Sequence, residues 1–210
     1  GVMKNNTMSI DDVLSRYKAD FERIWKEERY KWAAVKHYKD TLKIDAPDFA
    51  SMLAEGFSKA ASGPGALLAG GMYYPYKMIT AFAREDPETV RSMFLHLYDE
   101  SLPLAFRYTE FRAGCDKCLA AYRGNWEDRS KIQNHYQDLR AISVYLSFEY
   151  PDTYFLYKYK MYTQFRDLVG FPEKKGNTKS EIWKLENYGC LCRAVLDVIQ
   201  RDEQLLQMQK

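Results

Sequence analysis

Apolar residues recur at steps of three and four along most of this 210-residue chain, and this spacing constrains its fold more than any other feature. Val90, Met93, Phe94 and Leu97, for example, fall on one face of a helix with 3.6 residues per turn. The sequence has no runs of alternating apolar and polar residues joined by hairpin turns, which are typical of strands. It therefore predicts an all-α protein.

Capping residues and helix breakers predict where the helices begin and end. The first helical segment ends near Leu42, and the next begins at Asp45-Ala46-Pro47-Asp48, with Pro47 near its first turn. A Gly/Pro-rich connection from Ser62 to Pro75 interrupts the pattern. Further helices are expected over about Tyr76–Arg84, Asp86–Leu97, Pro103–Gly124, Asp138–Tyr150, Pro151–Val169 and Ser180–Gln200. We expect a single helical domain of about eight to ten helices over residues 3–200, with 201–210 leading into a following module.

Composition excludes several classes of protein. Hydrophobic residues make up 46% of the chain, which suffices for a core, and the formal net charge is only +2. No apolar run approaches the roughly 18 residues of a membrane span, and no signal-peptide core follows the first residues. Four cysteines without a secretory signal indicate a reducing compartment, so we expect a cytoplasmic protein that does not enter a membrane.

The cysteines allow two interpretations. Cys115-x-x-Cys118 and Cys190-x-Cys192 could supply four thiolates to zinc. Cys115, Cys118 and Cys192, however, fall on the apolar faces of expected helices, where a free cysteine packs as a small hydrophobe. Core packing is the favoured interpretation, and we expect neither a metal nor a cofactor.

Motifs for catalysis are missing from the sequence. His37, His96 and His135 do not form an HExxH pair, and none of them stands beside a serine or cysteine nucleophile. The glycine-rich stretches lack the spacing of a phosphate-binding loop, and no strand precedes them. We therefore expect no catalytic residue and no enzymatic activity in this chain alone.

Basic side chains alternate with aromatic ones in several places. Residues 16–43 carry nine basic and five acidic side chains, and residues 150–184 carry seven and four. The alternation is clearest in Tyr157-Lys158-Tyr159-Lys160. Lysines beside aromatic rings can hold phosphates next to stacked bases. The alternative is a solvated helix face whose aromatic side chains point into the core.

One segment and its continuation resemble a known family. The segment is His135-Tyr136-Gln137-Asp138-Leu139-Arg140-Ala141-Ile142-Ser143-Val144-Tyr145-Leu146, followed by Tyr150-Pro151 and Tyr157-Lys158-Tyr159. It is similar to the N-terminal region of McrB-type AAA+ restriction ATPases, the motor subunits of modification-dependent restriction systems. Shorter stretches extend the similarity over most of the chain: Trp25 to His37, Asp48-Phe49-Ala50, Val90 to Phe94 and Tyr98-Asp99-Glu100.

The resemblance implies a division of labour. In this family an N-terminal domain recognises DNA, an AAA+ module of the same chain hydrolyses nucleotide, and a partner subunit supplies the nuclease. The chain has no phosphate-binding loop up to Lys210, which fits an N-terminal domain placed before such a module. The expected function is thus DNA recognition in phage defence, with double-stranded DNA, modified or unmodified, as the ligand.

Candidate DNA contacts follow from these patterns. Lys158, Lys160, Lys174 and Lys175 would bind phosphates, with Tyr157 and Tyr159 beside them. Tyr136, Gln137 and Arg140 would select a base. Arg140 could equally pair with Asp138 inside the fold. The alternative function is a protein–protein interaction domain of the same defence system, without direct DNA contact.

Overall fold

The structure, a computed structural model, describes residues 31–63, 66–124 and 127–154, together with Asp12 and Glu186. The contacts divide the chain into two compact units, one of Gly1–Arg29 with Phe155–Lys210 and the other Tyr30–Tyr154. The single domain predicted over 3–200 spans both units. The expected boundary at residue 200 lies outside the described residues, as do almost all residues of the first unit.

The second unit is built from helices, as predicted. A helix covers residues 31–41 at the start of this unit. It is followed by α3 (Phe49–Gly56), the 3-10 turn η1 (Ser58–Ala60), α4 (Pro75–Glu85), α5 (Pro87–Leu97), α6 (Leu104–Gly124), the 3-10 turn η2 (Glu127–Arg129) and α7 (Leu139–Glu149). Within the described residues no strand forms, and only an isolated antiparallel bridge joins Gly70 to Tyr73. None of the described helices is both long and apolar enough to span a bilayer.

Aspartates cap three of the helices. Asp48 accepts a hydrogen bond from the Ser51 amide at 3.2 Å and starts α3, and Pro47 directly precedes this cap, near the first turn as expected. Asp86 and Asp138 cap α5 and α7 in the same way, through amides three residues ahead. Such caps satisfy amides that the first turn of a helix leaves unpaired.

Most predicted helix boundaries in this unit are confirmed, with two differences. The expected helices near 76–84, 86–97, 103–124 and 138–150 correspond to α4, α5, α6 and α7. α3 ends at Gly56, before the expected break at Ser62. Gly56 packs closely against Leu42, because a Cβ added to this glycine would lie 3.0 Å from Leu42 Cβ. Residues 151–153 form a turn and not the start of a helix. The remainder of the expected 151–169 and 180–200 helices lies outside the described residues, except for the helical Glu186.

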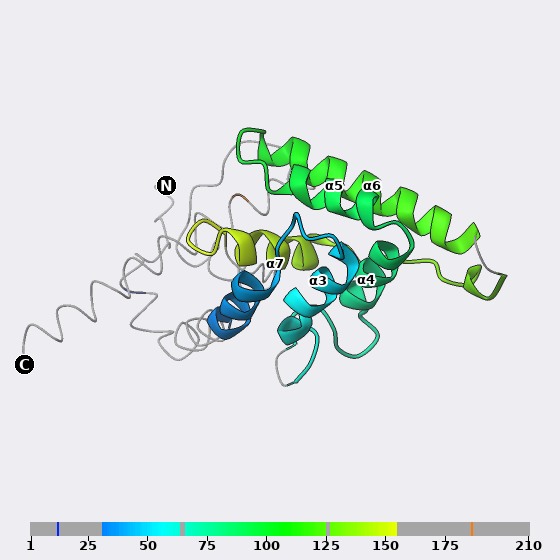
Figure 1. Cartoon of the computed structure of the whole chain (residues 1–210), viewed down its shortest axis with the longest axis horizontal. Coiled ribbons are helices and arrows are strands. Elements are labelled where there is room, and N and C mark those ends of the chain that lie inside the picture. The colour runs from blue at the N-terminus through cyan, green and yellow to red at the C-terminus, as the bar shows by residue number, and fades with distance from the viewer. Residues whose placement is uncertain (1–11, 13–30, 64–65, 125–126, 155–185, 187–210) are drawn as a thin grey trace, which may run out of the picture. The chain divides into compact units, whose positions relative to one another are not determined.

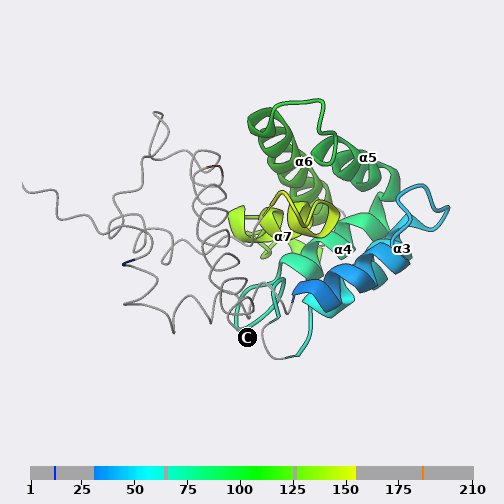
Figure 2. The same ribbon diagram turned by 90° about the vertical axis from the view of Figure 1, so that its left-hand side faces the viewer.

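Aromatic side chains fill the core around α7. In both views α7 lies between the antiparallel α5–α6 pair and the helix over 31–41 (Figures 1 and 2). Tyr145 of α7 contacts the rings of Phe57, Phe94 and Phe111 at centroid distances of 5.2, 5.2 and 5.8 Å. Residues 141–148 are all buried, so α7 is the central element of the unit.

Candidate nucleic-acid interface

Two turns, each leading into a helix, come together at the surface of this unit. One turn, residues 70–74, precedes α4, and the other, residues 134–138, precedes α7. The Tyr73 hydroxyl donates to Asp138 Oδ1 at 2.6 Å and joins them across 65 residues of sequence. We call the group of side chains formed here the tyrosine cluster. It consists of the exposed Tyr74, Lys77 and Arg140 and the half-buried Tyr73 and Tyr136.

The first turn is tight and depends on glycine. Gly70 and Gly71 have φ angles of +137° and +59°, which side-chain-bearing residues rarely adopt. The Tyr73 amide donates to the Gly70 carbonyl at 3.1 Å and closes the turn. A positive φ at Gly71 followed by a negative φ at Met72 matches the sign pattern of a type II′ turn. The turn places Met72 at its tip and Tyr73 and Tyr74 on its return arm.

The second turn is held by side chains that bind its backbone. His135 accepts the Gln137 amide proton at Nδ1, so its own proton is on Nε2 and is donated to Asp116 at 2.9 Å. The Asn134 side chain accepts from the Tyr136 amide at 2.7 Å. These bonds keep Tyr136 at a φ of +61°, where it is the sole described residue other than glycine with a positive φ. A bulky side chain in this region is strained.

Gln137 lies inside the fold and links the two turns. Only 1% of its surface is exposed, and its amide nitrogen donates to the carbonyls of Pro75 and His135, both at 2.8 Å. Its amide oxygen accepts from the Tyr145 hydroxyl. Both amide donors are therefore engaged, and neither is available to a base edge in this structure. Gln137 was predicted to contact a base, but its side chain is buried and lies outside the candidate contact surface.

The aromatic rings of the cluster stand nearly perpendicular to one another. The Tyr136 ring meets the rings of Tyr73 and Tyr74 edge to face, at centroid distances of 6.2 and 5.4 Å. Burial raises the pKa of Tyr73 well above its usual range, and the hydrogen bond to Asp138 raises it further. Tyr73 thus stays protonated and anchors the cluster, while Tyr74 and part of Tyr136 remain exposed.

Two cations border the rings. The Arg140 guanidinium carbon lies 4.5 Å from the centre of the Tyr73 ring, and Lys77 Nζ lies 5.6 Å from the Tyr74 ring. Both side chains are exposed. The Asp138 carboxylate binds the Tyr73 hydroxyl and the Ala141 amide, and it forms no ion pair with Arg140 among the described contacts. The Arg140 charge is thus held in place over an aromatic face without being neutralised by that carboxylate.

The structure brings together only part of the predicted site. Tyr136 and Arg140 lie in the tyrosine cluster, whereas Tyr157, Lys158, Tyr159, Lys160, Lys174 and Lys175 lie outside the described residues. Tyr73, Tyr74 and Lys77 were not among the predicted contacts. The Gly70-Gly71 pair followed by Tyr73-Tyr74-Pro75 indicated an irregular tyrosine-rich stretch, but nothing local connects it to residue 138.

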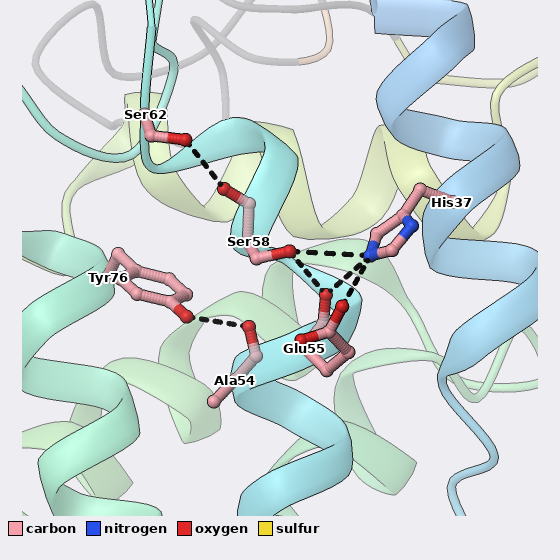
Figure 3. A network of polar contacts seen from close by, with 6 residues as sticks. All are labelled: His37, Ala54, Glu55, Ser58, Ser62 and Tyr76. Atoms are coloured by element: carbon pink, nitrogen blue, oxygen red, sulfur yellow. Dashed lines mark hydrogen bonds and ion pairs between the residues drawn. The ribbon is translucent and has the colours of Figure 1, made fainter.

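A second polar group contains a histidine, a serine and a glutamate but is not arranged for catalysis. His37 Nε2 lies 2.9 Å from the Glu55 carbonyl and 3.3 Å from Ser58 Oγ, and Ser58 itself donates to the Glu55 carbonyl at 2.7 Å (Figure 3). If Nε2 donates to the carbonyl, it cannot also accept the serine proton. These contacts satisfy the Glu55 carbonyl at the end of α3 and link this helix to the helix over 31–41.

The described cysteines pack in the interior. Cys115 is fully buried, and burial raises the pKa of its thiol well above the usual value. Burial also raises the pKa of Cys118, to about 11, and its Sγ lies 3.8 Å from Met93 Sδ. Within the part of the chain that the structure describes, no group of three or more metal-binding side chains gathers. Cys190 and Cys192 lie outside that part.

An open, polar hollow of about 430 Å³ lies between α3 and α4 and is lined by residues that include Asp48, Glu55, Tyr76 and Arg84. Two of its lining side chains have structural roles, because Asp48 caps α3 and the Tyr76 hydroxyl donates to the Ala54 carbonyl at 2.6 Å (Figure 3). The tyrosine cluster therefore remains the stronger candidate for a binding site.

Comparison of the chain with family models, with curated proteins and with solved structures finds no significant match. Function is therefore inferred from the geometry of the tyrosine cluster.

Proposed function

We propose that this chain is a DNA-recognition domain and that the tyrosine cluster contacts double-stranded DNA. The observation that carries the proposal is the position of Arg140, which lies exposed over the Tyr73 ring. An arginine whose planar head group is already oriented loses little conformational entropy when it binds a phosphate. Lys77, on the neighbouring ring, offers a second positive charge to the same backbone.

The tyrosines supply the other half of the proposed interface. Tyr74 and Tyr136 present partly exposed rings beside the two cations, and each aromatic face can pack on a base or a sugar. The strained backbone of Tyr136 costs roughly 1–3 kcal/mol, and such strain gathers at functional sites. The bonds from Asn134 and His135 maintain that strain, which supports a role for the ring outside the core.

The proposal extends to the setting suggested by the McrB resemblance. In that setting the domain directs an AAA+ module of the same chain, and through it a nuclease subunit, to double-stranded DNA that is modified or unmodified. Lys158, Lys160, Lys174 and Lys175, with Tyr157 and Tyr159, would supply phosphate contacts of their own. This chain itself would carry no catalytic residue.

The proposal is tested by fluorescence anisotropy of the full 210-residue chain with labelled duplexes at low and moderate salt. We expect Arg140→Ala and Lys77→Ala each to weaken binding about three- to tenfold and to reduce the salt dependence by about one phosphate contact. Lys117→Ala, which removes an exposed cation from α6, is the matched control and should bind as the unaltered chain does. If no duplex binds at low salt, the proposal is wrong.

A second candidate function, protein interaction, rests on a different surface. Leu95 of α5 and Phe106 of α6 are both about half exposed, and Phe106 meets the His96 ring edge to face at 5.1 Å. Exposed apolar side chains of this kind suit a protein partner. The salt dependence of the binding affinity distinguishes the two functions, because phosphate binding weakens steeply with ionic strength and binding through an apolar interface changes little.

A further inference from the structure

Met72 is the most exposed of the large hydrophobic residues that the structure describes, with 84% of its surface open to solvent. A single exposed hydrophobic side chain is common on protein surfaces and needs no explanation by itself. The position of Met72 is what distinguishes it. It stands at the tip of the tight turn over 70–73 and immediately precedes Tyr73 and Tyr74 of the tyrosine cluster.

The turn beneath Met72 is fixed at both ends. The bridge between Gly70 and Tyr73 closes it, and the Tyr73 hydroxyl is fastened to Asp138. The Tyr76 amide also donates to the Leu68 carbonyl at 3.0 Å, which ties the chain before the turn to the start of α4. Met72 therefore stands on a fixed turn and directly precedes Tyr73 and Tyr74, whose rings contact the exposed cations Arg140 and Lys77.

We propose that Met72 is a wedge that enters between two adjacent base pairs of the bound duplex and unstacks them. This inference rests on the proposed DNA binding and adds the manner in which the duplex is deformed. Apolar side chains, methionine among them, are inserted between base steps by proteins that bend DNA. The thioether chain is unbranched and flexible, so it can fill the irregular space between separated bases.

The surroundings of Met72 match what such a wedge requires. Unstacking is unfavourable, so a wedge acts only where other contacts hold the backbone against it. Arg140 and Lys77 supply these contacts, and the exposed Tyr74 ring can cover a base at the opened step. A base step that is already weakened costs less to open, so the wedge should favour duplexes that contain a mismatch.

The test compares the binding of two duplexes, one fully matched and one with a single central mismatch. Both carry 2-aminopurine at the same central position, and the fluorescence of this base rises on unstacking. The full 210-residue chain is expected to bind the mismatched duplex about fivefold or more tightly and to raise the fluorescence of both duplexes. Met72→Ala should lose most of the preference and the fluorescence rise, while Met72→Leu should keep both. Leu95→Ala, which truncates an exposed apolar residue on α5, is the matched control.

A preference and a fluorescence rise that disappear only in Met72→Ala support the wedge. Salt-sensitive binding without a mismatch preference, or with a preference that Met72→Ala retains, overturns the wedge and leaves the proposed DNA binding intact. Failure to bind either duplex at low salt overturns both proposals.

Discussion

Arg107 donates a hydrogen bond from Nη2 to the hydroxyl oxygen of Tyr154 at 2.8 Å, although 47 positions separate the two residues. The arginine is 3% exposed, and its other donors bind the carbonyls of Leu97, at the end of α5, and Leu102, in the following loop. The buried Arg107 guanidinium thus satisfies the Leu97 carbonyl at the end of α5 and links it to Tyr154, in the segment after α7. The charge also suits the negative end of the α5 dipole.

Replacement of Arg107 by methionine is expected to lower the free energy of unfolding by about 3 kcal/mol, because it leaves buried carbonyls without donors. Tyr154→Phe removes only one of the bonds and should cost about 1 kcal/mol. Urea denaturation followed by circular dichroism measures both changes. Equal stability of the Arg107→Met variant and the unaltered chain would show that the buried cation contributes nothing.

Tyr136→Asn should separate stability from binding. Asparagine tolerates a positive φ better than tyrosine does, so the backbone strain falls and the free energy of unfolding should stay constant or rise by up to about 1 kcal/mol. The affinity for duplex DNA should fall about tenfold because an aromatic face is lost. Thermal denaturation and anisotropy on the same preparation measure the two effects. A clear loss of stability would mean that the Tyr136 ring serves the core.

Stability at alkaline pH should depend on Tyr38. Burial raises the pKa of this tyrosine well above its usual range. The Glu149 carboxylate accepts a hydrogen bond from the Tyr38 hydroxyl at 2.6 Å and raises the pKa further. Above pH 10 the unfolded chain releases the Tyr38 proton while the folded chain keeps it, so the stabilisation is complete below pH 10 and is lost as the pH rises beyond it.

The difference in unfolding free energy between the unaltered chain and Tyr38→Phe should therefore shrink by about 1.4 kcal/mol per pH unit above pH 10. Urea denaturation at several values between pH 8 and 11 gives this slope. A constant difference over the whole range would indicate that Tyr38 titrates normally.

Cys118 should react slowly with iodoacetamide. Its pKa of about 11 leaves roughly one thiol in a thousand ionised at pH 8, and the rate should rise about tenfold per pH unit between pH 7 and 9. Peptide-resolved mass spectrometry follows Cys118 separately from the other cysteines, and the same reaction in urea provides the unprotected rate. Modification of Cys118 at that unprotected rate in the folded chain would contradict its raised pKa.

Local patterns predicted the helices well because capping and helix breaking depend on near neighbours. Asp86 and Asp138 each bind an amide three residues ahead, and the prolines at the starts of α4 and α5 act within their own first turns. The site was predicted less well. The pairing of Tyr73 with Asp138 spans 65 residues and has no local pattern. One partner of the buried Gln137 amide, the Pro75 carbonyl, is likewise 62 residues away.

The amide of Gln137 binds the carbonyl of Pro75, at the start of α4, and that of His135, in the turn before α7. Neither turn of the tyrosine cluster can therefore shift without disturbing the other. A redesign of what this surface binds must exchange residues 70–75 and 134–140 together. If one turn were exchanged alone, the contacts that position the tyrosine rings of the two turns against each other would be lost. A library that varies both turns together while keeping Gln137 is the practical route to new specificities.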